Sequence, residues 1–373
     1  MTTVSITKYD AICNLGNNID EIFCNAINSD VSRLQRDTDF IKEKSFYLGK
    51  VDCEFSPIED KNFATRTNKF LYKLAQDMEI DKFVEKYGKE NVAIILATTN
   101  SGTEEFANNN NPKLSEIGNP ALFLKNLLGT KNFATSISTA CSSGIKVFSS
   151  AKRLIESGIC KAAIVGGSDE LSHVSIHGFN SLEILSNERT QPFSKNRKGI
   201  NIGEAASLFT IEQSDKGIEI MGVGETSDAY HASSPDPEAT QIKLALKLAL
   251  DNSALKPENI DYINLHGTGT IANDACEAKA VYEIFKGKTP CNSTKSLTGH
   301  CLGAAATLET AICCKSLEKN LILKHNFDGQ FDSNLPQINL PKENINKKIR
   351  YVINNAFGFG GTNAVLVLGK RHE

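Results

Sequence analysis

The chain has 373 residues, of which 40% are hydrophobic and 23% are charged, and its formal net charge is −3. Such a chain can form two domains or one compact unit of two similar halves, and its charge gives no reason to expect nucleic acid as a partner. No apolar run approaches the roughly 18 residues that cross a bilayer, and residues 1–10 lack the features of a signal peptide, so we expect a cytoplasmic protein.

The first half of the chain alternates between strand and helix patterns, while residues 30–60 favour no particular element. The expected elements are, in order, a strand at 4–7, a turn at 14–16, a helix at 19–27, a helix through 70–78, a strand at 92–97, an asparagine-rich loop at 100–112, a strand at 161–166 and a strand at 203–211.

Between these strands, a β-prone run over residues 135–140 leads into Cys141, and small residues then open a helix. The apolar positions Ile145, Phe148 and Ala151 recur at helical spacing, so the thiol is expected at a helix N-terminus. Unpaired amides and the helix dipole there favour the thiolate, which is the nucleophilic form, and the amide of Cys141 could help to bind an oxyanion. A packing role remains the alternative, because cysteine is among the most buried residue types.

The ten cysteines are scattered along the chain. Their spacings match neither a zinc site nor a disulfide framework. We expect reduced thiols, one of them with a special role, and no metal site.

The second half repeats the order of the first. The expected elements are a strand near 218, a helix at 241–251, a strand at 262–265, a helix at 274–285, a short segment at 291–295 and a helix at 302–317. We place the boundary between the halves at residues 213 and 214, which gives an N-terminal half of 1–213 and a C-terminal half of 214–373. Cys141 and His300 are each followed by glycine three positions later, a weak sign of duplication.

Alternating strands and helices predict an α/β protein with mostly parallel sheets. In duplicated halves, strand ends and helix N-termini would converge on one central cleft. That arrangement would bring Cys141 close to residues encoded far downstream.

Two histidines and a glycine-rich loop are the candidate partners of Cys141. His266 directly follows an apolar strand, and His300 lies at another junction between a strand and a helix. A lone histidine is more often structural than catalytic, but two at such junctions favour chemistry. Residues 354–363 contain three glycines between two apolar strands, which fits a simple β-turn or a loop whose amide faces the thiol.

Together, these segments resemble the β-ketoacyl-acyl carrier protein synthases, in the branch of the thiolase superfamily that has a Cys-His-His triad. The matching segments are 139–144, 228–231, 266–270, 295–305 with Glu309, and 357–363. Their order matches too, and the resemblance covers nearly the whole chain. It implies a thiolase-like α/β fold, in which two duplicated βαβ halves form α-β-α-β-α layers.

The resemblance implies a decarboxylative Claisen condensation and a role for each matched residue. Cys141 would accept the acyl group as a thioester. His266 and His300 would donate hydrogen bonds to the thioester oxygen of a malonyl-carrier substrate while carbon dioxide leaves. Lys295 and Glu309 would organise the triad electrostatically, and the ammonium would keep the imidazole of His300 neutral.

The resemblance also implies residues that bind and admit the substrate. The amide of Phe359 would complete the oxyanion hole, and Phe359 would swing with Gly358 and Gly360 as a gate. Thr268 and Thr270 would hold the phosphopantetheine arm. No cofactor would be bound permanently, because this arm arrives on the acyl carrier protein.

The implied partners are the acyl carrier protein with its acyl and malonyl thioesters, and a second subunit in a homodimer or a heterodimer with a related ketosynthase subunit. The pathway would be fatty acid, aryl polyene or polyketide assembly. Only 39 positions separate Gly102 from Cys141, which is short for this family and leaves the acyl chain length and the form of the dimer open.

Three other functions are weighed against this one. A hydrolase that uses Cys141 would leave the paired histidines and Lys295 unexplained. A non-catalytic subunit of the chain-length-factor type would lack the nucleophile, whereas this chain has Cys141. A coenzyme A-dependent thiolase would have a second reactive cysteine in the C-terminal glycine loop, and residues 357–361 contain none.

Overall fold

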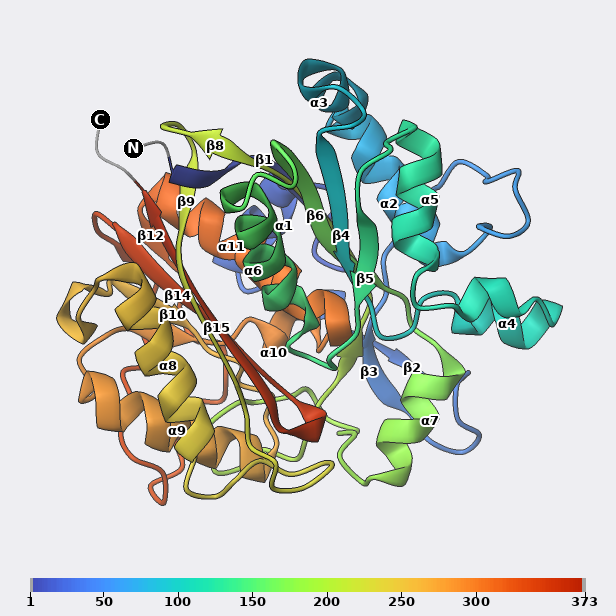
Figure 1. Ribbon diagram of the computed structural model, residues 1–373. Helices are drawn as coiled ribbons and strands as arrows, with labels where there is room; N and C mark the ends of the chain where they lie inside the picture. The colour runs from blue at the N-terminus through green and yellow to red at the C-terminus, as the bar shows by residue number, and fades with distance from the viewer. Residues whose placement is uncertain (1–2, 371–373) are drawn as a thin grey trace.

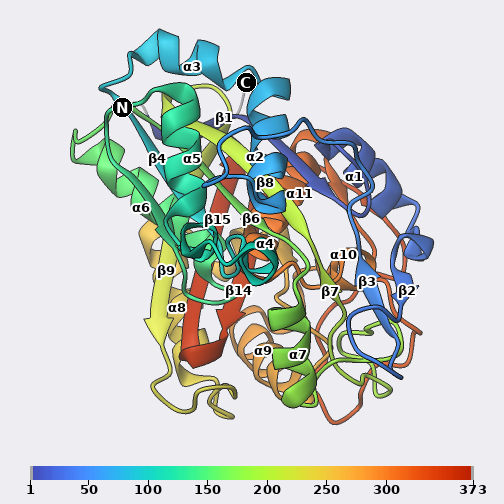
Figure 2. The same ribbon diagram turned by 90° about the vertical axis from the view of Figure 1, so that its right-hand side faces the viewer.

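A ten-stranded mixed sheet runs through the computed structural model, which describes residues 3–370 (Figures 1 and 2). The strands are β1 (Thr3–Cys13), β2 (Gln35–Asp37), β3 (Phe46–Gly49), β4 (Val92–Ala97), β5 (Ala134–Ile137), β6 (Ala162–Asp169), β7 (Ile202–Gly203), β8 (Ala205–Ser214), β9 (Ile218–Ser227), β10 (Tyr262–Asn264), β11 (Cys291–Asn292), β12 (Leu321–Ile322), β13 (Ile345–Asn346), β14 (Tyr351–Gly358) and β15 (Thr362–Lys370). The large sheet has the order β11-β10-β14-β15-β9-β1-β8-β6-β4-β5.

The helices of the described residues cover both faces of this sheet. They are α1 (Ile19–Ile27), α2 (Arg66–Asp77), α3 (Ile80–Tyr87), α4 (Thr103–Asn109), α5 (Asn119–Leu128), α6 (Ser143–Glu156), α7 (His173–Ser181), α8 (Thr240–Ser253), α9 (Ile271–Phe285), α10 (Lys295–Thr298) and α11 (Ala305–Lys319). Figure 1 shows α6 and α11 side by side in the middle of the molecule, with α2 and α5 on one flank and α8 and α9 on the other.

Alternate residues of the inner strands face two different cores. In β4, Ile95 packs in the central core, whereas Ile94 and Leu96 pack in an outer core with α2 and α5. In β14, Val352 faces the central core and Ile353 faces an outer core with α8 and α9. Because side chains alternate along a strand, each half of the sheet is covered on both faces. These layers confirm the expected α-β-α-β-α arrangement.

The two halves of the sheet have the same internal order. In the first half the order is β1-β8-β6-β4-β5, and in the second it is β9-β15-β14-β10-β11. β4 lies parallel to β5 and β6, as β10 lies parallel to β11 and β14. α6 follows β5, and α11 follows β11 by way of α10. The N-terminal ends of both central helices therefore lie at the carboxyl ends of the parallel strands.

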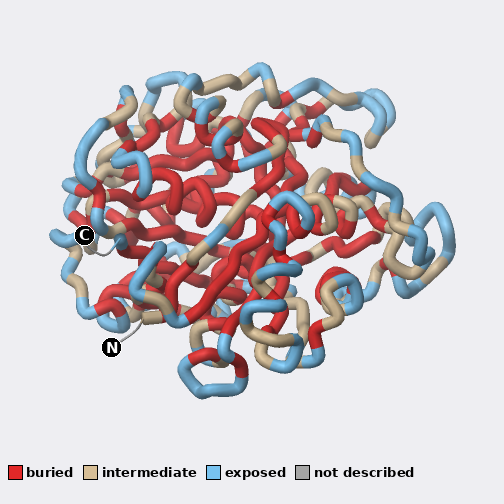
Figure 3. Tube along the Cα trace, turned by 90° about the horizontal axis from the view of Figure 1, so that it is seen from above, coloured by how far each residue is buried: buried red, intermediate tan, exposed pale blue. Residues whose placement is uncertain are grey.

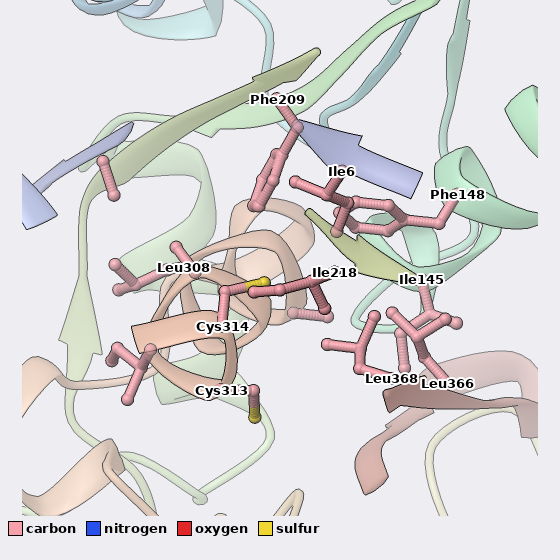
Figure 4. Packing of buried hydrophobic residues seen from close by; sticks show 14 of the residues in the cluster. Ile6, Ile145, Phe148, Phe209, Ile218, Leu308, Cys313, Cys314, Leu366 and Leu368 are labelled. Carbon is pink, nitrogen blue, oxygen red and sulfur yellow. The ribbon is translucent and has the colours of Figure 1, made fainter. Parts of the chain in front are cut away.

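The central core between the halves is closely packed. Phe148 of α6 meets Phe209 of β8 edge-on, with 4.9 Å between ring centroids. Both rings are fully buried, as is Leu308 of α11, and burying a side chain of this size contributes roughly 1.5–3 kcal/mol. Figure 4 shows these residues with Cys313 and Cys314 between the strands of the two halves.

Two details of the sequence prediction are wrong. Residues 100–112 are not one loop, because α4 forms within them despite their asparagine content. The sheet is also not mostly parallel: β14 and β15 are joined by only three residues, and a connection this short permits only antiparallel pairing. The boundary between 213 and 214 falls at the end of β8, and its meaning as a domain boundary stays a prediction.

Exposed residues lie mainly along the outer loops and helices, and the interior of both halves is buried (Figure 3). Among residues 3–370, no helix combines the length and apolar character that crossing a bilayer requires.

Candidate active site

Cys141 lies in a tight turn between β5 and α6. Ala140 has a left-handed backbone with φ of +51°, which is unfavourable for a side chain with a Cβ. The Ser143 hydroxyl stabilises this turn, since it donates to the Ala140 carbonyl at 2.6 Å and accepts from the Thr139 amide at 2.8 Å. A Cβ on Gly144 would lie 2.7 Å from the Thr307 amide, so this glycine lets α6 approach α11.

Two histidines from the second half reach the thiol. His266 follows β10, and His300 lies between α10 and the short 3₁₀ turn that precedes α11. His300 Nε2 is 3.0 Å from Cys141 Sγ, and the ligand atoms of the three side chains all lie within 4.8 Å of one another. The imidazole rings are nearly perpendicular, at 84°. The fold thus brings together side chains up to 159 positions apart.

The hydrogen bonds around the imidazoles define their tautomers. The Leu302 amide donates to His300 Nδ1 at 3.2 Å. The Lys295 ammonium, which can only donate, lies 3.5 Å from His266 Nδ1. Since both Nδ1 atoms act as acceptors, each neutral ring carries its hydrogen on Nε2. His300 therefore donates to the sulfur of Cys141.

A buried ion pair supports the histidines. Lys295 Nζ lies 2.5 Å from Glu309 Oε1, and the two side chains are only 1% and 2% exposed. The same ammonium donates to the His266 carbonyl oxygen at 2.6 Å. Burial raises the pKa of Glu309, and Lys295 opposes this increase. Lys295 and Glu309 lie behind the histidines and do not line the cavity.

Burial controls protonation throughout the site. It lowers the pKa of His266 and of His300 well below the ordinary value, and the Lys295 ammonium lowers both further. It raises the pKa of the Cys141 thiol to about 11, against the opposing effects of Lys295 and of the Phe359 and Cys141 amides. The amides near the helix N-terminus thus favour the thiolate, in the expected direction, but desolvation outweighs them and the pKa of the thiol is raised overall.

A cavity of about 320 Å³ leads to these three side chains. Thr268 and Thr270 line it, with 3.0 Å between their hydroxyl oxygens. Phe359 lines it too, and its ring lies 5.8 Å from that of Phe179 on α7. Gly358 is among the lining residues.

The loop that carries Phe359 approaches the nucleophile turn closely at Gly358. A Cβ on Gly358 would lie 3.1 Å from the Cys141 amide, whereas a Cβ on Gly360 would meet nothing within 4 Å. Gly360 is exposed and does not line the cavity. Its φ of +79° makes it suited to a hinge.

Sequence reasoning missed two acidic residues of α9 that hold His266 and the glycine-rich loop after it. Glu277 accepts from the His266 and Gly267 amides, both at 2.7 Å, and burial raises its pKa to about 7. Asp274 accepts from the Gly269 amide at 3.2 Å. The available signal was the pair of acids, three positions apart, on a helix with many apolar residues. Buried carboxylates need hydrogen-bond donors, so such a pair indicates backbone amides nearby.

One thiol and two imidazoles are also ligands that zinc accepts. The ammonium of Lys295 disfavours a cation beside His266. The expectation that this site works without a metal stays a prediction.

The chain matches two family models that follow each other along the sequence. Residues 51–216 match the β-ketoacyl synthase N-terminal domain, and residues 218–326 match the β-ketoacyl synthase C-terminal domain. A curated relative from Coxiella burnetii, named 3-oxoacyl-[acyl-carrier-protein] synthase 2, is 37% identical over 257 residues, which are 63% of this chain and 61% of the relative. The enzyme of the same name from Staphylococcus aureus strain COL is 32% identical over 260 residues, 65% of this chain and 63% of that protein. The chain thus aligns with less than two thirds of these relatives' length.

A solved structure is similar over almost its whole length. It is the ketosynthase ApeO in complex with its chain length factor ApeC from Xenorhabdus doucetiae, and the matched chain is 35% identical with a TM-score of 0.95. The match covers 99% of this chain and 98% of that one. With its thiolase-like fold and its Cys-His-His cluster, the protein belongs to the β-ketoacyl synthase family.

Proposed function

We propose that the protein is a β-ketoacyl-acyl carrier protein synthase, an acyltransferase that joins a Cys141-bound acyl group to a malonyl unit with loss of carbon dioxide. The observation that carries this proposal is the contact of 3.0 Å between His300 Nε2 and Cys141 Sγ, with the second imidazole beside it. The names of the curated relatives support the same activity.

In the first half-reaction Cys141 takes the acyl group from a carrier thioester. A new bond forms between Sγ and the acyl carbon, the bond to the carrier sulfur breaks, and the carrier thiolate takes the proton that Cys141 gives up. The amides of Cys141 and Phe359 bind the oxyanion of the tetrahedral intermediate. In the resting site both amides lower the pKa of the Cys141 thiol through hydrogen bonds, which supports this role.

In the second half-reaction a malonyl thioester enters the same cavity. Once Cys141 is acylated, its sulfur is a poor acceptor, so the Nε2 hydrogen of His300 becomes available to the malonyl thioester oxygen. His266 donates a second hydrogen bond there. These two donors stabilise the enolate that forms as carbon dioxide leaves, and its carbon attacks the acyl carbonyl. The bond to Sγ then breaks, and the sulfur takes up one proton.

Lys295 and Glu309 act as positioning residues in this proposal. The ammonium repels a proton from both imidazoles, so that they remain neutral donors, and Glu309 balances its charge. Thr268 and Thr270 hold the phosphopantetheine arm of the acyl carrier protein, which delivers both substrates. Phe359 moves against Phe179 to admit the acyl chain.

A second subunit binds at the free edge of β5, the last strand of the large sheet. Exposed apolar side chains gather around this edge: Phe133 is 51% exposed, Leu122 43% and Leu127 41%. An unpaired edge strand with apolar neighbours favours association with another chain. The subunit is a second copy of this chain or a related ketosynthase subunit, and the ketosynthase of Xenorhabdus doucetiae is found with a chain length factor.

Mass spectrometry after mixing with an acyl-carrier protein tests the first half-reaction. An acyl adduct on Cys141 is expected in the wild type and not in Cys141→Ala, and an adduct at another residue would rule out the assigned nucleophile. A non-catalytic partner subunit would acquire no adduct from any acyl donor.

The roles of the two half-reactions can be separated with His300→Ala. This variant should still acylate Cys141 but lose the release of carbon dioxide from malonyl-carrier protein, because the oxyanion amides remain and one enolate donor is lost. Loss of both activities together would contradict this division.

A further inference from the structure

Four polar groups link the end of the Phe359 loop to the turn that presents Cys141. Lys146 Nζ donates to the Thr362 hydroxyl at 2.7 Å. The Thr362 and Ser142 hydroxyl oxygens are 3.1 Å apart, and Ser142 Oγ donates to the Thr139 carbonyl at 2.8 Å. Lys146 is half-buried on α6, and Thr362 is the first residue of β15.

The chemistry of these groups fixes the direction of every hydrogen bond in this series. A carbonyl oxygen can only accept, so the Ser142 hydrogen goes to Thr139. An ammonium can only donate, so Thr362 accepts from Lys146 and must give its own hydrogen to Ser142. The order is therefore Lys146 to Thr362 to Ser142 to the Thr139 carbonyl, and bonds aligned in this way strengthen one another.

This series of hydrogen bonds joins the two backbone segments that supply the oxyanion amides. The Thr139 carbonyl belongs to the strained turn directly before Cys141, and Thr362 ends the loop that carries Phe359. At the other end of that loop, a Cβ placed on Gly358 would lie 3.1 Å from the same carbonyl oxygen, so the loop approaches the turn closely there too. The loop is thus held at both ends. Between them the Gly360 amide donates to the Ala232 carbonyl at 2.7 Å, whereas a Cβ placed on Gly360 would meet nothing within 4 Å.

We propose that Lys146 is a positioning residue that keeps the Phe359 amide in register with the Cys141 amide while the gate opens and closes. It acts through Thr362 and Ser142 and touches neither substrate nor the reacting sulfur. This inference rests on the proposed acyl transfer to Cys141.

Lys146→Met removes the ammonium and keeps most of the stem, and Lys146→Arg restores a donor. Single-turnover acylation of Cys141 should slow at least about tenfold in Lys146→Met, since small misplacements of reacting groups cost this much or more, and should recover largely in Lys146→Arg. Thr362→Val breaks the next link, and combining it with Lys146→Met should add little further loss. Lys152→Met is the matched control, because Lys152 also lies on α6 but donates to the Ile220 carbonyl at 2.8 Å, away from the loop.

Alkylation of Cys141 by iodoacetamide, followed by peptide mass spectrometry, needs no oxyanion hole. Its rate should fall much less than the acylation rate in Lys146→Met if the role is positioning, because alkylation depends on the thiolate but not on oxyanion binding. A parallel fall of acylation and alkylation, or wild-type acylation in Lys146→Met, would overturn the inference.

Hydrogen exchange of the peptide that spans residues 357–363 gives a readout independent of activity. Exchange should be faster in Lys146→Met and unchanged in Lys152→Met. If the wild type itself acquires no acyl group, the proposed function fails, whereas this measurement still decides whether Lys146 holds the loop. Equal exchange in Lys146→Met and the wild type would contradict that role.

Discussion

Removing the ammonium from the buried pair of Lys295 and Glu309 should destabilise the protein in a pH-dependent way. The pair is almost fully buried, and the ammonium also satisfies the His266 carbonyl at 2.6 Å. Lys295→Met leaves the Glu309 carboxylate without its cation. Breaking a buried pair by removing one partner costs about 3–5 kcal/mol, so we expect a loss of this size in the free energy of unfolding near pH 7.5.

The sign of the pH dependence follows from Glu309. Burial already raises the pKa of this carboxyl above its ordinary value of 4.5, and loss of Lys295 raises it further. A group whose pKa is higher in the folded state contributes stability below the unfolded pKa, and this contribution is lost as the pH rises through the folded pKa. The variant should therefore lose up to about 1.4 kcal/mol for each pH unit above 4.5 until the new pKa is reached.

Urea unfolding between pH 7 and 8.5 measures the pH dependence that comes from Glu309, because His266 and His300 do not contribute in this range. Their pKa values are lowered from 6.5 in the folded state, so they destabilise the fold only as the pH falls below about 6.5. The control is Lys295→Met with Glu309→Gln, which removes the buried carboxyl. The slope with pH should disappear in this double variant. The reasoning is refuted if the double variant keeps the slope, or if Lys295→Met unfolds at the wild-type urea concentration.

Three further predictions concern Cys141 and its surroundings. Because burial raises the pKa of the Cys141 thiol to about 11, its alkylation rate should rise about tenfold per pH unit between pH 7 and 10, and a rate that levels off within this range would contradict the prediction. Gly358→Ala should slow acylation at least about tenfold, because the new Cβ would displace the Phe359 loop, whereas Gly118→Ala has open space around its Cβ and should leave the rate unchanged. Prolonged dialysis against EDTA should not reduce acylation, because the Lys295 ammonium beside His266 disfavours a bound cation; loss of acylation on dialysis would reveal a required metal.

Most regular elements were predictable from local patterns. The helix at 19–27 and the strand at 92–97 occur with the expected bounds, because their apolar spacing and their end signals agree. The loop expected at 100–112 contains α4, because a short surface helix leaves little apolar periodicity to detect. Lys146 carried no signal at all, since its partner Thr362 lies 216 positions away.

The amino-acid sequence by itself determined which groups are available for chemistry: one cysteine at a junction of strand and helix, two histidines at similar junctions, and a loop rich in glycine. Their types and order along the chain are properties of the polymer, so motifs could reveal them. Only the tertiary structure decided how these groups are protonated. Burial raises the pKa of the Cys141 thiol and keeps both imidazoles neutral, because the cost of a charge depends on solvent exposure and on neighbours from distant parts of the chain.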